Sequence, residues 1–143
     1  MFIKTIYKEE RGLTFLEIVV VIALITIGAL IVSSGFDEVR KRARDSTRVS
    51  DISQIQRALG LYNISANRFP IEPDEVAITG NDKFSQVMQN EFEARRVPTD
   101  PLTPVLTYRY ISNEDGSDYH LGFCLETESI AGYTRGCENE VGP

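Results

Sequence analysis

The chain has 143 residues and a formal net charge of −6, which is enough for one modest domain and an additional segment. The acidic balance argues against attraction to nucleic acid through overall charge. With one histidine, no GxSxG motif, no P-loop and no paired Cys and His, the chain lacks the parts for nucleophilic or metal-assisted hydrolysis, so we expect no enzyme.

The first predicted element is an apolar helix that begins near the N-terminus. Residues 13–32 are apolar apart from two threonines, one glycine and Glu17. At about 1.5 Å per residue, such a helix covers about 30 Å, the thickness of a bilayer core, so we predict a transmembrane segment over residues 13–34. The alternative is a signal peptide that is removed. Ser33-Ser34-Gly35 could mimic the small-residue cleavage site of such a peptide. The length of the run and its glutamate favour a retained helix.

The helix is expected to continue beyond the apolar run. No proline occurs in residues 36–66, and apolar side chains recur there at three- or four-residue spacing. The stripe consists of Val49, Ile52, Ile55, Leu59 and Tyr62. We therefore predict an amphipathic half over residues 35–66, which ends at Asn67-Arg68-Phe69-Pro70 because proline cannot continue a helix.

Residues 67–143 are expected to form a small globular domain. Residues 71–81 are interpreted as a loop, and Asp82 is expected to cap a helix from Lys83 to about Arg96. The apolar face of that helix would be formed by Phe84, Val87, Met88 and Phe92.

Period-2 alternation predicts a β-hairpin further along the chain. Its arms are residues 106–111 and 119–125, joined by a turn over residues 113–118, and a short strand is expected around Tyr133-Thr134. His120 is expected on the surface of the second arm. The fold class is therefore α+β: a long N-terminal α-helix followed by a small domain with a short helix and an antiparallel β-sheet.

Two cysteines, Cys124 and Cys137, lie near the C-terminus. If this region lies outside the membrane, they are able to form a disulfide. Closing a loop of this length would stabilise the domain by about 3 kcal/mol in the chain-entropy model. The alternative is two unrelated thiols.

The segment Arg11-Gly12-Leu13-Thr14-Phe15-Leu16-Glu17 resembles the cleavage motif of type IV prepilins and type II secretion pseudopilins. Residues 51–62 and the following Asn67-Arg68-Phe69-Pro70 are similar to the helix end and turn of the major pseudopilins. The resemblance implies a pilin-like fold, a leader peptide over residues 1–12, cleavage between Gly12 and Leu13, and N-methylation of Leu13. Two departures are Leu13, where phenylalanine is commonest, and the absence of the proline that many type IV pilins have in this helix.

Glu17 is a lone carboxylate in the apolar run, where an ionisable group costs roughly 2.5 kcal/mol or more. The resemblance implies that it pairs with the new N-terminal amine of a neighbouring subunit during assembly. Such pairing makes a buried charge tolerable. The alternative is a carboxylate that is protonated, or that reaches the membrane interface.

The resemblance also implies the partners and the location of the chain. The partners are copies of the chain in a helical filament, a prepilin peptidase that also methylates, and an inner-membrane assembly platform. The chain would cross the inner membrane once with its C-terminal domain outside, and then enter a periplasmic or extracellular filament. The alternatives are a DNA-uptake pilin and a single-span membrane-anchored binding domain that never polymerises.

Two further groups of residues suggest ligands. The basic residues Arg40, Lys41, Arg42, Arg44 and Arg48 could contact lipid headgroups, neighbouring subunits or DNA, or form a solvated face. The oxygen-rich turn that contains Asn113, Asp115 and Asp118 could hold calcium, which major pseudopilins are known to bind in their C-terminal loops. A plain hairpin turn explains the same residues without a metal.

Overall fold

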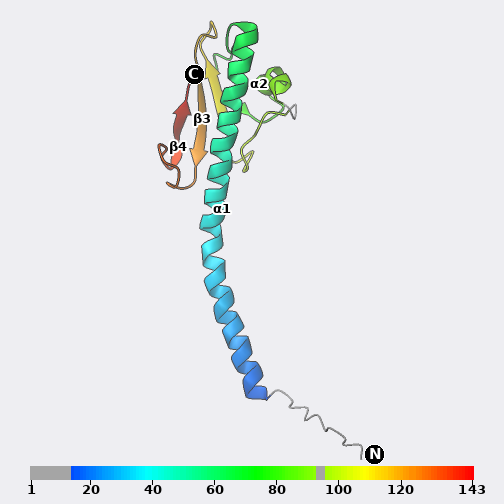
Figure 1. The fold of residues 1–143 in the computed structure, drawn as a ribbon, viewed down its shortest axis with the longest axis vertical. Coiled ribbons are helices and arrows are strands. Elements are labelled where there is room, and N and C mark those ends of the chain that lie inside the picture. Colours follow the sequence, from blue (N-terminus) through cyan, green and yellow to red (C-terminus); the bar gives the residue numbers. More distant parts are fainter. Residues whose placement is uncertain (1–13, 93–95) are drawn as a thin grey trace, which may run out of the picture. The chain divides into compact units, whose positions relative to one another are not determined.

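The computed structural model describes residues 14–92 and 96–143, and for residues 30–35 it describes the backbone without the side chains. The contacts divide the chain into two compact units that meet at Asp37 and Glu38. We call them the N-terminal unit and the C-terminal unit. The fold is α+β, with helices, a short 3-10 helix and an antiparallel sheet, as the sequence predicts (Figure 1).

Helix α1 spans Phe15–Ala66. It ends where the sequence predicts, because Asn67 adopts a left-handed conformation with φ of 56° and Phe69-Pro70 follows. An asparagine in this conformation is a common helix terminus. The amphipathic stripe is also confirmed, since Ile52, Ile55 and Leu59 are almost completely buried.

The C-terminal unit has two layers, the second half of α1 and a four-stranded antiparallel sheet. The strands are β1 at Val76–Ile78, β2 at Tyr108–Ser112, β3 at Tyr119–Leu125 and β4 at Gly136–Val141. The strand order is β1-β2-β3-β4. The β2–β3 hairpin confirms the predicted one, with Tyr110 opposite Leu121 and Ser112 opposite Tyr119.

Both edge strands differ from the prediction. Strand β1 lies within residues 71–81, which we expected to be a loop, and it is only three residues long, too short for a periodic pattern. Strand β4 lies at Gly136–Val141 and not around Tyr133-Thr134. Only one of its six residues, Asn139, is buried, and its sequence has no apolar alternation. Edge strands are held mainly by backbone hydrogen bonds to one neighbour, and these leave little trace in a sequence.

The predicted helix after Asp82 is shorter than expected. Helix α2 spans Lys83–Met88, a 3-10 turn follows at Gln89–Glu91, and Phe92 is extended. The predicted cap is confirmed, because Asp82 accepts a hydrogen bond from the Ser85 N–H at 2.8 Å. Val87 is 44% exposed, so the buried face of α2 is formed by Phe84 and Met88 without it.

The core lies between the sheet and the part of α1 that belongs to the C-terminal unit (Figure 1). Aromatic side chains fill much of it. Phe84 and Tyr110 have ring centroids 4.3 Å apart, and Phe69 packs edge-on against Tyr119 at 4.7 Å. The buried Tyr110 hydroxyl donates a hydrogen bond to the Pro70 carbonyl at 2.8 Å, which connects the segment after α1 to the sheet.

Within the part of the chain that the structure describes, no helix is sufficiently long and apolar to cross a membrane. The transmembrane assignment of residues 13–34 is therefore not confirmed.

Candidate functional site

The first turn of α1 contains Glu17, the residue that the sequence singles out. The Glu17 N–H donates a hydrogen bond to the Thr14 hydroxyl at 3.3 Å, which makes Thr14 the cap of the helix. Thr14-x-x-Glu17 has the sequence of a capping box, of which this bond is one half, and a carboxylate in the first turn also interacts favourably with the helix dipole. The sequence analysis missed this role of Thr14, although the spacing Thr14-x-x-Glu17 was its signal. Gly12 and Leu13 lie outside the described residues.

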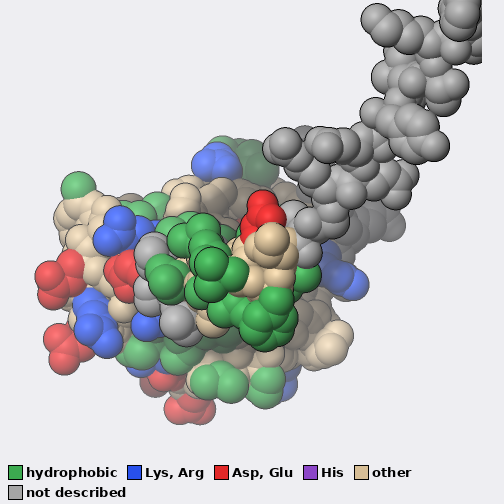
Figure 2. Space-filling model, turned by 90° about the horizontal axis from the view of Figure 1, so that it is seen from below, with side chains coloured by type: hydrophobic (Ala, Val, Ile, Leu, Met, Phe, Trp, Pro, Cys, Tyr) green, Lys and Arg blue, Asp and Glu red, His purple; other side chains and the backbone are tan. Residues whose placement is uncertain are grey.

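The helix surface that follows Thr14 is apolar and exposed. Ten large hydrophobic side chains within residues 15–27 are between 45% and 83% exposed: Phe15, Leu16, Ile18, Val19, Val20, Val21, Ile22, Leu24, Ile25 and Ile27. Thr26 satisfies its own hydroxyl by donating to the Ile22 carbonyl at 2.6 Å. Figure 2 shows hydrophobic side chains gathered at this end of α1. A helix that is apolar on all sides is normally buried, so this surface needs a covering.

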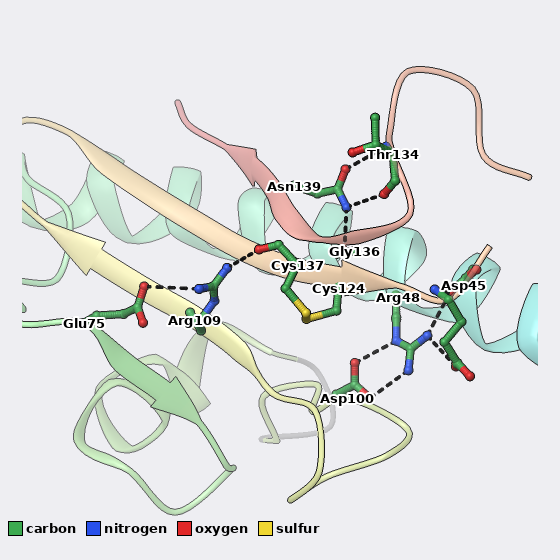
Figure 3. The surroundings of a disulfide bond; sticks show 11 residues. Asp45, Arg48, Glu75, Asp100, Arg109, Cys124, Thr134, Gly136, Cys137 and Asn139 are labelled. Atoms are coloured by element: carbon green, nitrogen blue, oxygen red, sulfur yellow. Dashed lines mark hydrogen bonds and ion pairs between the residues drawn. A yellow bond between two sulfur atoms is a disulfide. The ribbon is translucent and has the colours of Figure 1, made fainter. Parts of the chain in front are cut away.

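The C-terminal unit contains a buried cluster of charges centred on Arg48, whose side chain has no exposed area. Its Nε and Nη2 donate to the two Asp100 carboxylate oxygens at 2.7 and 3.2 Å, and its Nη1 donates to Asp45 and Glu126, both at 2.8 Å (Figure 3). Arg44 also binds Glu126 in a bidentate manner, because its Nε and Nη2 donate hydrogen bonds to the two carboxylate oxygens at 2.7 and 2.6 Å. We call these five residues the Arg48 cluster.

The Arg48 cluster connects α1 to two segments that are distant in the sequence. Asp100 lies in the irregular segment before β2, and Glu126 follows β3 directly. Asp45 also accepts hydrogen bonds from the Thr127 N–H at 2.8 Å and the Thr127 hydroxyl at 2.7 Å. The charges of the cluster are therefore extensively hydrogen-bonded, which is the condition under which a protein tolerates buried ions.

The same contacts shift the pKa values of the acids. The Arg44 guanidinium, and then Arg48, hold the pKa of Glu126 at about 2. Burial alone would raise the pKa of Asp45, but the N–H groups of Glu126 and Thr127, the Thr127 hydroxyl and Arg48 outweigh it and lower the pKa. Both carboxylates are therefore charged at neutral pH.

The predicted basic patch is not one surface, which corrects that interpretation. Arg48 is completely buried and therefore not available to lipid or DNA, and the guanidinium of Arg44, which is 27% exposed, is held by Glu126. The signal for this was in the sequence. Asp45 and Arg48 continue the buried stripe of Ile52 toward the N-terminus at three- and four-residue spacing. Arg40, Lys41 and Arg42 remain at least partly exposed.

The disulfide between Cys124 and Cys137 is present and connects β3 to β4 (Figure 3). Cys124 is buried and Cys137 is exposed. Residues 125–136, which the disulfide closes, include Glu126 and Thr127. The disulfide and the Arg48 cluster therefore hold the same loop.

Comparison with known proteins gives two relatives, both called type II secretion system core protein G. The relative from Pectobacterium carotovorum subsp. carotovorum is 30% identical over 97 residues, which are 65% of this chain and 62% of the relative. The relative from Aeromonas hydrophila is 33% identical over 63 residues, 44% of each chain. These two relatives support a place for the chain in the superfamily of type IV pilins and type II secretion pseudopilins.

This superfamily assignment rests on the two relatives and on the fold together. No protein-family model matches the chain, and no solved structure matches it. The matched part is less than two thirds of the length of either relative.

The predicted calcium residues form hydrogen bonds within the turn itself. The Asn113 side-chain oxygen accepts from the Asp118 N–H at 2.9 Å, Asp115 accepts from the Ser117 N–H at 3.0 Å, and Asp118 accepts from the Tyr119 N–H at 2.8 Å. Among the described residues, no three or more His, Cys, Asp or Glu side chains gather as a metal site would need. These hydrogen bonds fit the alternative of a plain hairpin turn.

Proposed function

We propose that the chain is a structural subunit of a type II secretion pseudopilus and not an enzyme. The observation that carries this proposal is the exposed apolar surface of residues 15–27. Burying a large aliphatic side chain contributes up to about 1.5–3 kcal/mol, so covering ten of them would contribute on the order of 10 kcal/mol per subunit. Copies of the same helix are a natural covering, and the core protein G relatives support this choice.

We further propose that the chain is made as a prepilin. A prepilin peptidase would cleave between Gly12 and Leu13 and methylate the new N-terminus at Leu13. Before assembly, residues 13–34 would anchor the chain in the inner membrane, with the C-terminal unit outside. An assembly platform in that membrane would then add the subunit to a periplasmic filament.

In the filament, Glu17 would pair with the N-terminal amine of a neighbouring subunit. A carboxylate among apolar helices is tolerable only when it is paired, so subunits in the wrong register would be penalised. The first turn of α1 provides a competing explanation, because Thr14-x-x-Glu17 has the sequence of a capping box, in which the Glu17 side chain would accept a hydrogen bond from the Thr14 N–H. These two roles require different properties of the side chain, charge in one case and hydrogen-bonding geometry in the other.

The first experiment tests processing and assembly. The full chain is produced with and without a prepilin peptidase, and its N-terminus is read by mass spectrometry. We expect the mature chain to begin at a methylated Leu13 and Gly12→Asp to block cleavage. Cysteine cross-links between copies at residues 18 and 25 then report assembly. A wild-type chain that is never shortened would refute the proposal that the protein is made as a prepilin. One that is cleaved but never cross-linked would indicate a single-span binding domain.

The second experiment separates the two roles of Glu17. Glu17→Gln retains the capping box, since glutamine serves at this position, but it removes the charge. Thr14→Ala removes the cap and keeps the charge. We expect Glu17→Gln to be cleaved yet to lose cross-linked filaments, and Thr14→Ala to keep them. Normal filaments from Glu17→Gln would show that the charge has no assembly role.

A further inference from the structure

A polar cleft in the C-terminal unit borders the Arg48 cluster and shares Glu126 with it. Its volume is about 440 Å³. One wall is the side of α1 at Glu38, Lys41 and Arg42, and the other is formed by residues 126–129 and Arg135. The cleft is therefore lined by side chains of both charges and by the hydroxyl-bearing residues Thr127 and Ser129.

The two walls are held in place before any ligand binds. The Arg48 cluster joins them, because Arg44 and Asp45 of α1 contact Glu126 and Thr127 of the loop. The Thr127 and Ser129 hydroxyls lie 2.7 Å apart, which fixes the loop itself. Because both walls are already positioned, binding does not have to bring them together, which favours affinity.

Part of the charge in the cleft is already compensated within the protein. Arg42 lies 3.4 Å from Glu38, and Glu126 is engaged by Arg44 and Arg48. Among the described residues, three other side chains of the cleft take part in no ion pair: Lys41, Arg135 and Glu128. The cleft therefore offers two cations and one carboxylate to a ligand, a combination that suits a molecule with both a negative and a positive group.

The position of the cleft in the sequence indicates the source of such a molecule. Glu38 and Lys41 follow the end of the predicted span at residue 34 by four and seven residues. At about 1.5 Å per residue this is about 6–10 Å of helix. The polar layer of a bilayer is about 5–7 Å thick on each side, so these residues would reach the headgroups or lie just beyond them.

We propose that this cleft binds the headgroup of a phospholipid that carries both a phosphate and a primary ammonium, as phosphatidylethanolamine does. Lys41 and Arg135 contact the phosphate, and Glu128 accepts hydrogen bonds from the ammonium. A choline group has no N–H to donate, and a purely anionic headgroup leaves Glu128 unpaired. This inference rests on the proposed membrane anchoring of the subunit.

The test uses the full chain in micelles of a non-ionic detergent and the soluble probe glycerophosphoethanolamine, with binding followed by NMR of the loop amides at residues 126–135. Inorganic phosphate, glycerophosphocholine and glycerophosphoglycerol are compared at the same ionic strength. We expect saturable binding that is tightest for glycerophosphoethanolamine. Arg135→Gln and Glu128→Gln should each weaken it about tenfold, because each variant removes one charged hydrogen-bond partner of the probe.

Lys83→Gln, at the start of α2 and outside the cleft lining, is the matched control and should not change the affinity. Equal binding of all four probes, or the same affinity in Arg135→Gln and Glu128→Gln as in the wild type, would overturn the proposal. Binding of inorganic phosphate as tight as that of the headgroup probe would reduce the cleft to an anion site and also overturn it. The measurement uses unassembled chain, so its failure is distinguishable from a failure of cleavage or filament formation.

Discussion

Arg48→Met removes the cation at the centre of the Arg48 cluster and keeps much of the side-chain volume. Four hydrogen bonds are lost, two of them to Asp100. Asp45 retains hydrogen bonds from the loop N–H groups, and Glu126 retains Arg44. Asp100 loses both of its bonds from Arg48 and retains the hydrogen bond from the Leu102 N–H at 2.7 Å. The substitution therefore leaves a buried carboxylate almost without compensation.

Removing one partner of a buried ion pair costs about 3–5 kcal/mol. The whole stability of a domain is about 5–15 kcal/mol, so this is a large part of it. For a domain of about 100 residues, it corresponds to a fall in melting temperature of more than about 10 °C. The matched control Arg57→Met, on the exposed face of α1, should change stability by less than about 0.5 kcal/mol.

Urea unfolding of the full chain, followed by tyrosine near-UV circular dichroism, measures the effect, since the chain has six tyrosines and no tryptophan. The double variant Arg48→Met/Asp100→Leu removes both the cation and the Asp100 carboxylate that would otherwise be left unpaired. We expect it to be more stable than Arg48→Met alone, because an apolar replacement of a whole buried pair is often nearly neutral. A loss below about 1 kcal/mol in Arg48→Met, or a double variant as unstable as the sum of the singles, would refute the reasoning.

Three further predictions concern the C-terminal unit. The pKa values of Glu126 and Asp45 are lowered by folding, so the stability that they contribute is present above their unfolded values and is lost as the pH falls. Thermal unfolding should therefore show constant stability above about pH 5 and a decline from about 4.5 toward 2, and Glu126→Gln should flatten that decline; an unchanged profile would contradict this. Replacing Cys124 and Cys137 by serine should cost about 3 kcal/mol in urea unfolding, whereas a loss near zero would mean that the disulfide does not constrain the unfolded chain. Asp82→Ala should cost about 1–2 kcal/mol, because the carboxylate accepts hydrogen bonds from two loop N–H groups as well as from the N–H that it caps, and an unmoved urea midpoint would exclude this role.

The apolar run, the amphipathic stripe, the end of α1 and the β2–β3 hairpin were all predictable from the sequence. Each depends on local rules: helical or alternating periodicity, and the inability of Pro70 to continue a helix. The pairing of Cys124 with Cys137 was also predictable, because the chain has no other cysteines. The edge strands β1 and β4 escaped prediction because backbone pairing with one neighbour requires no particular side-chain pattern.

The sequence by itself determined that this protein has a long helix with a predominantly apolar beginning and a small α+β domain after it. Only the tertiary structure decided what the charged residues do. In the sequence, Arg44 and Arg48 belong to one basic run with Arg40, Lys41 and Arg42. In the fold, two of the five turn inward to Asp45, Asp100 and Glu126. The reason is physical: the partner of a charge is chosen by proximity in space, and Arg48 and Asp100 are 52 residues apart in the chain.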